Sequence, residues 1–275
     1  MLVALVWGST FVLVKDAVVT VPVFPFLAFR FAVGAVVLWA LSRAAGTKYD
    51  ARALGAGSIL GVALFAGYAL QTAGLLHTTA SKAGFITGLN VILVPIGAAA
   101  LLRARPSGAS VAGAMLSAAG MAFLCLQEVE LPGKGDLLLL GCAFAFALQV
   151  LLVAKYSRQI ESLALCTVQL AMACLLSVIA GLVVDGATAF LIVDWSIWGA
   201  IGFLGIAATA GAFLLQMIAQ KRTTATRTAL ILALEPVFAA LFSWLLAGET
   251  LSFVQWGGGV LILGGIILSE IGPAE

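Results

Sequence analysis

The residues of this sequence that can do chemistry are a few polar side chains that interrupt long apolar stretches. Glu235 lies deepest among them, within an Ala-Leu-Glu-Pro segment. An ionisable side chain at the centre of a lipid-embedded helix costs roughly 2.5–3.5 kcal/mol, so it usually faces a cavity or a partner. Two roles follow for Glu235: a cavity carboxylate that binds an amine or a proton, or a neutral acid in a helix-packing hydrogen bond.

Uncharged amides form the second group of candidates. Gln71 and Gln216 suit a polar or zwitterionic solute, although hydrogen bonding between helices is at least as common a role. Tyr68 precedes Gln71 by three residues, so both side chains share one helix face. Asn90 and Gln149 complete this set of polar residues within apolar stretches.

Aromatic and basic residues near the start of the chain are also candidates. Trp7 and Phe11 have the i, i+4 spacing of one helix face and could stack on an apolar part of a solute. Lipid contact and plain packing are the competing roles. Arg30 is either a contact for an anion or an interfacial charge that snorkels toward the membrane surface, and the sequence favours the second. The single histidine, His77, is expected at the interface.

Signatures of enzymes are missing from this sequence. Its four cysteines have no C-x-x-C spacing, which predicts buried single thiols, with neither a disulfide nor a metal site. One histidine and no clustered acids argue against catalysis. The chain also has no G-x-x-x-x-G-K-[ST] loop. We therefore expect a protein that is not an enzyme, holds no cofactor or metal, and depends on solute or ion gradients.

The composition is that of an integral membrane protein. Hydrophobic residues make up 63% of the 275 and charged residues 9%, against about 45–50% and ~25% in a soluble domain. Apolar runs of about 20 residues match the ~30 Å hydrocarbon core of a bilayer. Residues 1–15 lack the basic start of a signal peptide and are taken as part of the first span. The sequence predicts an all-α protein with ten transmembrane helices, at 2–20, 25–43, 54–76, 81–102, 107–126, 136–156, 162–184, 195–219, 224–246 and 251–270.

Basic residues predict the orientation of these spans. Ten of the fourteen Lys and Arg fall in or beside the loops after the second, fourth, sixth and eighth spans. Cytoplasmic loops carry an excess of Lys and Arg, so both termini are expected on the cytoplasmic side. The ten residues are Arg43, Lys48, Arg52, Arg103, Arg105, Lys155, Arg158, Lys221, Arg222 and Arg227.

An internal repeat relates the two halves of the chain. Residues 61–124 align without a gap with 206–269, and this alignment places Gln71 opposite Gln216. Earlier segments follow at a slightly shorter offset, with Trp7 opposite Phe146. The repeated unit therefore comprises five helices and occurs twice.

Two units of five helices must enter the membrane from opposite sides, because five is odd. The sequence thus predicts two inverted five-helix repeats, 1–131 and 132–275, with the N- and C-termini both inside. Inverted repeats are common in secondary transporters, where the substrate site lies near the bilayer midplane between the halves.

Four motifs follow one another along the chain: Trp7-Gly8-Ser9-x-Phe11-x-x-x-Lys15, Arg30-Phe31, Ala233-Leu234-Glu235-Pro236 and Gly248-Glu249-x-Leu251-Ser252. Together they resemble the EamA-type domain of the drug/metabolite transporter superfamily, and the likeness covers nearly the whole chain as two tandem domains. In the first repeat, Asn90-Val91 stands where the second has Glu235-Pro236. The resemblance implies a central cavity lined by helices 1–4 and 6–9, with helices 5 and 10 at the periphery.

Characterised members of that superfamily include exporters of amino acids and related metabolites. The resemblance therefore implies a secondary transporter of the plasma membrane, which is the inner membrane if the organism is a Gram-negative bacterium, that exports small metabolites by alternating access. Amino acids, including aromatic ones, are the favoured solutes, protons are a candidate coupling ion, and no nucleic acid is expected. The alternatives are a transporter of sugars, nucleotide sugars or cationic drugs, and a membrane subunit that does not transport. The expected substrate-binding residues are Trp7, Phe11, Tyr68, Gln71, Asn90, Gln149, Gln216 and Glu235.

Overall fold

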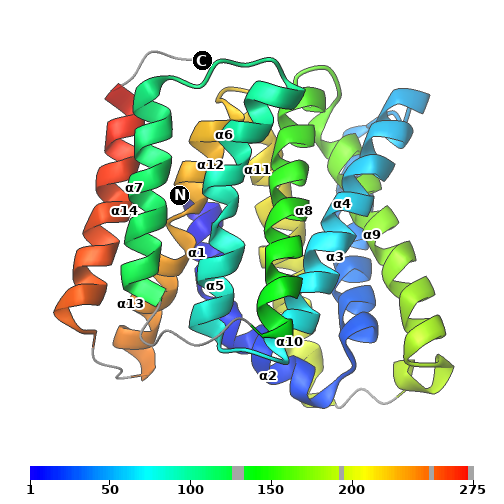
Figure 1. The fold of residues 1–275 in the computed structure, drawn as a ribbon. Coiled ribbons are helices and arrows are strands. Elements are labelled where there is room, and N and C mark those ends of the chain that lie inside the picture. Colours follow the sequence, from blue (N-terminus) through cyan, green and yellow to red (C-terminus); the bar gives the residue numbers. More distant parts are fainter. Residues whose placement is uncertain (126–132, 192–194, 248–250, 272–275) are drawn as a thin grey trace.

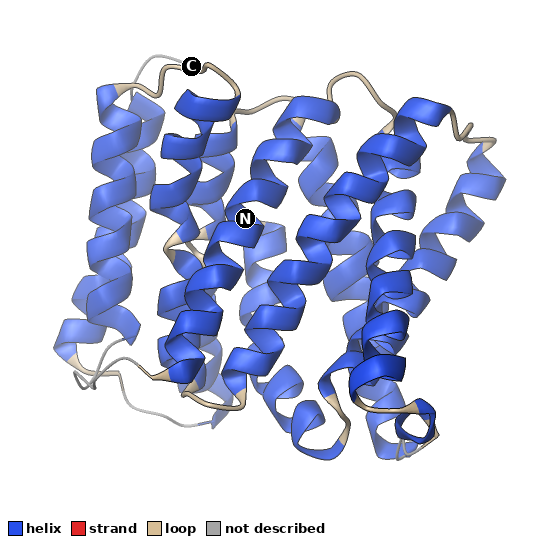
Figure 2. Ribbon diagram, turned by 45° about the vertical axis from the view of Figure 1, so that its right-hand side comes forward, coloured by secondary structure: helices blue, strands red, loops and turns tan. Residues whose placement is uncertain are grey.

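The computed structural model describes residues 1–125, 133–191, 195–247 and 251–271 (Figure 1). Within these ranges every regular element is a helix and no strand occurs (Figure 2). The same ranges contain nine segments long and apolar enough to cross a membrane. The prediction of an all-α, multi-pass membrane protein is confirmed. The segments are Val23–Ala45, Ala51–Leu75, Lys82–Leu101, Gly108–Cys125, Lys134–Tyr156, Ser162–Val184, Ile197–Gln220, Ala225–Phe242 and Phe253–Ile271.

The first expected span, 2–20, is not one continuous helix. It consists of α1 (Leu2–Gly8) and α2 (Phe11–Thr20), separated by Ser9 and Thr10. Each of these two hydroxyls donates a 2.7 Å hydrogen bond to the backbone carbonyl three residues earlier. Serine and threonine side chains that bond to nearby carbonyls favour helix ends and bends. This local competition was not anticipated from the apolar composition.

Two further spans are broken near their middles into pairs of shorter helices: α5 (Ala80–Gly88) with α6 (Asn90–Leu101), and α12 (Ala225–Leu232) with α13 (Glu235–Ala247). Asn90 and Glu235 are therefore the first residues of the second helix in their pairs. The second break lies just before Pro236. Transmembrane helices that are broken near their middle are a recurring feature of transporter binding sites.

A π-helical segment interrupts one more span. The chain passes from α10 (Trp195–Gly205) through η2 (Ile206–Gly211) into α11 (Ala212–Gln220). A π-helix has i→i+5 hydrogen bonds and occurs mostly as single turns within α-helices, often at functional sites.

The remaining helices form a bundle around these broken spans. In Figure 1, α7 and α14 lie together at one edge and α9 lies toward the other. This agrees with the peripheral place that the resemblance implies for helices 5 and 10. The elements are α3 (Val23–Ala45), α4 (Ala51–Leu75), α7 (Gly108–Cys125), α8 (Lys134–Tyr156), α9 (Ser162–Val184), the short 3₁₀ turn η1 (Ala187–Phe190) and α14 (Phe253–Ile271).

The α7–α14 contact brings two backbones together through glycine. A Cβ atom added to Gly258 would lie 2.5 Å from the carbonyl oxygen of Gly120 and 2.6 Å from the backbone nitrogen of Leu124. Only residues without a side chain permit this approach, as in other helix pairs within membranes.

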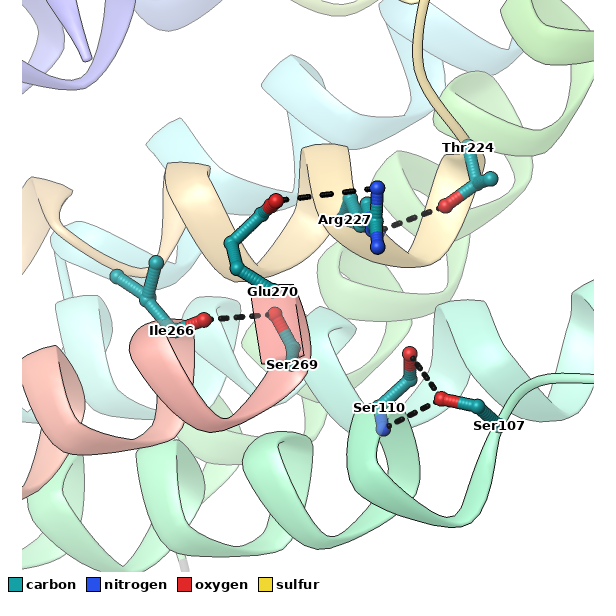
Figure 3. A network of polar contacts seen from close by, with 7 residues as sticks. All are labelled: Ser107, Ser110, Thr224, Arg227, Ile266, Ser269 and Glu270. Carbon is teal, nitrogen blue, oxygen red and sulfur yellow. Dashed lines mark hydrogen bonds and ion pairs between the residues drawn. The ribbon is translucent and has the colours of Figure 1, made fainter. Parts of the chain in front are cut away.

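One end of the bundle holds the loops that carry most of the basic residues, the upper end in Figure 1. There Thr224 caps α12 by accepting a 3.2 Å hydrogen bond from the backbone N–H of Arg227. Arg227 also lies 3.8 Å from the carboxylate of Glu270 on α14. Figure 3 shows this network beside Ser107, whose hydroxyl caps α7 by accepting from the backbone N–H of Ser110 at 3.1 Å. These contacts fix the ends of three neighbouring helices.

Candidate functional site

A cavity lined by polar and aromatic side chains lies within the described part of the bundle. The space in it that is not filled by protein atoms, its mouth included, amounts to about 880 Å³. Its described lining residues come from α1 to α6, α8, α11, α12 and α13, and from Thr10 and Ala233 at two of the breaks.

Seven of the eight expected binding residues line this cavity. The side chain of the eighth, Phe11, lies outside the described part of the structure. The structure therefore brings together residues from distant parts of the chain, while their role in binding a solute stays a prediction. The seven are Trp7, Tyr68, Gln71, Asn90, Gln149, Gln216 and Glu235.

Glu235 is placed by the break between α12 and α13. As the first residue of α13, it lies at a helix N-terminus, where the helix dipole favours a negative charge. Pro236 follows it in the first turn. Backbone N–H groups there have no partner within the helix, so the N–H that proline lacks costs no hydrogen bond. The side chain is only partly buried although it lies deep in the bundle, and no described residue donates a hydrogen bond to it. Glu235 is thus a carboxyl group open to the cavity.

Arg30 also lines the cavity, and the preference for a snorkelling charge was wrong. Its side chain is 2% exposed. The Nε atom donates a 2.8 Å hydrogen bond to the hydroxyl of Thr209 in the π-helix η2, and Nη2 donates to the Tyr68 hydroxyl at 3.2 Å. The guanidinium carbon lies 4.6 Å from the centre of the Tyr68 ring. These partners lie far away in sequence, so spacing along the first helices gave no signal of them.

The amides differ in their surroundings. The Nε2 group of Gln216 donates to the side-chain oxygens of Gln149 at 3.3 Å and Gln220 at 3.1 Å. Gln220 in turn donates to the backbone oxygen of Val150 at 3.0 Å. These bonds join α8 to α11, so Gln216 has the packing role that we weighed against solute binding. No described residue forms a hydrogen bond with the Gln71 side chain, which lines the cavity. Gln220 was missed by the sequence analysis.

Aromatic rings form one wall of the cavity. The ring centroids of Trp7 and Phe213 are 5.1 Å apart, and those of Tyr68 and Phe146 are 5.3 Å apart. Trp7 also donates a 2.8 Å hydrogen bond from Nε1 to the backbone oxygen of Ala208 in η2. Such pairs are tilted or edge-on, the geometry that aromatic side chains prefer. The wall offers an apolar surface of fixed shape.

One part of the expected lining is absent. The resemblance implies that the seventh helix, α9, faces the cavity, but α9 contributes none of its described lining residues. Instead α9 packs behind α4, where Gly57 lies so close to it that an added Cβ would meet the Cβ of Val168 at 2.6 Å. The close glycine contact holds α9 in an outer position.

Comparisons with known proteins agree with this architecture. The family model described as "EamA-like transporter family" matches residues 1–126 and 133–271. An uncharacterized transporter of Archaeoglobus fulgidus is 34% identical over 270 residues, covering 98% of this chain and 84% of that protein. The uncharacterized transporter YetK of Bacillus subtilis is 25% identical over 276 residues, covering 96% of this chain and 83% of that protein.

A solved crystal structure has the same fold. It superposes with a TM-score of 0.81 at 22% sequence identity, covering 98% of this chain and 95% of the other. The family match spans both halves of the sequence, and the nine apolar helices agree with a multi-pass protein of the plasma membrane. The chain belongs to the EamA-like transporter family, as its motifs suggested.

Proposed function

We propose that this protein is a secondary transporter that exports small metabolites, above all amino acids, by alternating access through the cavity between its two halves. The observation that carries this proposal is the carboxyl group of Glu235, to which no residue in the described part of the chain donates a hydrogen bond, in a cavity that also contains neutral amides and an aromatic wall. Glu235 would bind the ammonium group of the solute. Gln71 would offer hydrogen bonds, and Trp7 would contact an apolar or aromatic side chain.

The lining of the cavity supports an inverted repeat. Many lining residues form pairs at the two offsets of the sequence repeat, so both halves contribute equivalent positions. Alternating access requires such equivalence, because exchanging the conformations of the halves then opens the cavity to the other side. The pairs are Trp7 with Phe146, Thr10 with Gln149, Tyr68 with Phe213, Gln71 with Gln216, and Asn90 with Glu235.

The peripheral helices α7 and α14 support the same symmetry. The hydroxyl of Ser117 lies 3.4 Å from the backbone oxygen of Ile262, and these residues are 145 positions apart, which is the offset of the repeat. A contact between repeat-equivalent residues is expected on a two-fold axis. Moving each residue of the Gly120–Gly258 contact to its repeat equivalent gives Gly265 with Gly113, which also touch.

The distribution of basic residues supports both termini inside. The loops with most Lys and Arg share one end of the bundle, and such loops are usually cytoplasmic. The cavity extends toward the opposite end, where its lining includes Leu75, the last residue of α4. In this conformation the cavity therefore faces outward, and the amides around Gln216 lie on its inner side.

Counterflow tests this proposal without knowledge of the coupling ion. Purified protein in liposomes loaded with an unlabelled solute is diluted into the same solute in labelled form. The panel contains neutral, aromatic, acidic and basic amino acids, a sugar, a nucleotide sugar and a quaternary ammonium drug. We expect transient accumulation of at least one neutral or aromatic amino acid, absent from protein-free liposomes. Accumulation of none of the amino acids would overturn the proposal, whichever other solute accumulates.

A further inference from the structure

We propose that Arg30 binds the carboxylate of the solute and thereby restricts this carrier to molecules that bear both a carboxylate and an amine. The inference rests on the proposed function, since it assigns a second charged contact in the same cavity. Among the described lining residues of the cavity, Arg30 is the basic side chain and Glu235 is the acidic one. They come from different halves of the chain.

The guanidinium of Arg30 is incompletely satisfied by the protein. It has five N–H donors, and the structure gives two of them a partner, the neutral hydroxyls of Thr209 and Tyr68. No described carboxylate lies within ion-pair distance of it. Glu235 interacts with Arg30 electrostatically without contacting it, so the other N–H groups of this buried guanidinium still lack an acceptor, which is costly. The remaining donors of Arg30 can therefore take an anion in the cavity.

The surroundings of Arg30 hold its guanidinium in a defined orientation. Thr209 belongs to the π-helical segment η2 and accepts from Nε, while the Tyr68 ring lies under the guanidinium carbon at 4.6 Å. A fixed guanidinium plane presents two parallel N–H groups, which match the two oxygens of a carboxylate. Thr209 and Tyr68 are positioning residues for this contact. The π-helix thus has a function: it brings Thr209 to Arg30.

The charges in the cavity favour a zwitterion over other anions. A phosphate ester carries up to two negative charges and would face Glu235 with only one basic side chain in the described lining to offset them. A simple amine would leave Arg30 without a counter-ion, and a sugar would compensate neither charge. An amino acid compensates both, because its carboxylate and ammonium lie on one carbon atom.

Binding to both charges would also couple the solute to the conformational change. Arg30 lies on α3 in the first half, and Glu235 begins α13 in the second. A zwitterion that contacts both joins the halves across the cavity. If the cavity closed around Arg30 and Glu235 with no zwitterion bound, two separated charges would be buried, which is costly. Solutes with one charge would therefore bind weakly and be carried slowly.

Competition by matched solutes tests this inference. Counterflow of labelled L-phenylalanine is measured against phenethylamine, which lacks the carboxylate, and 3-phenylpropionate, which lacks the amine. For the parent protein we expect each analogue to inhibit at least ten-fold more weakly than phenylalanine. If a different neutral amino acid gives the largest counterflow, its own amine and acid analogues replace these.

Variants of Arg30 test whether this side chain causes the selectivity for phenylalanine over phenethylamine. In Arg30→Gln we expect the inhibition constant of phenylalanine to rise at least ten-fold while that of phenethylamine stays the same, so selectivity disappears. Arg30→Lys, which keeps the positive charge, should retain part of the selectivity for phenylalanine over phenethylamine. Arg43→Gln is the matched control, because Arg43 is an exposed arginine on the same helix. If Arg30→Gln does not fold, Thr209→Val keeps the charge, removes one acceptor and should lower the selectivity by a smaller factor.

The outcomes separate the two proposals. A parent protein that transports phenylalanine but is inhibited equally by phenethylamine contradicts the role of Arg30 and leaves amino acid export standing. Unchanged selectivity in folded Arg30→Gln, or in Thr209→Val where Arg30→Gln does not fold, contradicts it as well. A parent protein that transports no amino acid contradicts the proposed function itself.

Discussion

Substituting alanine for Gly258 should separate α7 from α14 and destabilise the protein. The added Cβ would lie 2.5 Å from the Gly120 oxygen and 2.6 Å from the Leu124 nitrogen, both backbone atoms that no side-chain rotation can move. Real Cβ contacts essentially never fall below 3.0 Å, so the helices must shift apart. Overpacking of this kind costs about 1–3 kcal/mol. At ~2–4 °C per kcal/mol for a chain of roughly this size, the melting temperature should fall by several degrees.

The neighbouring glycine is the control. Gly257 is exposed on the same helix, and an added Cβ there would meet nothing within 4 Å. Both substitutions gain the same intrinsic helix propensity, up to ~1 kcal/mol, so the difference between them isolates the contact. Melting is followed by circular dichroism in one detergent. Equal melting temperatures for Gly258→Ala and Gly257→Ala would refute the tight α7–α14 contact.

Two further predictions concern orientation and the π-helix. On a background without the native cysteines, Lys48→Cys should resist an impermeant maleimide added to intact cells, whereas Thr188→Cys should react; the opposite pattern would reverse the topology. Trp7→Phe keeps the ring but loses the 2.8 Å hydrogen bond to Ala208, so we expect a loss of about 0.6–1.7 kcal/mol in stability. Trp39→Phe, at an exposed position, should lose none, and equal melting temperatures would show that the Trp7 bond contributes nothing.

The positions of the spans were predictable because each depends on a long apolar run. The seventh was expected at 162–184, and α9 spans Ser162–Val184. The breaks after Gly88 and Leu232 were not expected from the polar Asn90 and Glu235 beside them, because polar residues such as Gln71 also occur within continuous helices. Whether a backbone leaves the helix there depends on groups from other helices that accept its freed hydrogen bonds.

The cavity was predictable only in part, for a similar reason. A carboxyl or amide within an apolar run is costly wherever it lies, so Glu235 and Gln71 could be chosen from cost alone. The buried position of Arg30 depends on a hydrogen bond to Thr209, which is 179 positions away, and on a π-helical turn with no recognisable sequence pattern. Gln216 lines the cavity, but its partners Gln149 and Gln220 are brought to it only when α8 and α11 pack together.

Transport by the Glu235→Gln variant tests the central claim most directly. The substitution keeps the shape and hydrogen bonding of the side chain while removing its charge and its titratable proton. In the amino acid counterflow assay we expect the variant to melt like the parent protein yet accumulate little labelled solute. Glu270→Gln, a control at the exposed end of α14, should transport normally. Parental counterflow by Glu235→Gln, with the same dependence on pH, would contradict a solute-binding or proton-coupling role for the cavity carboxyl.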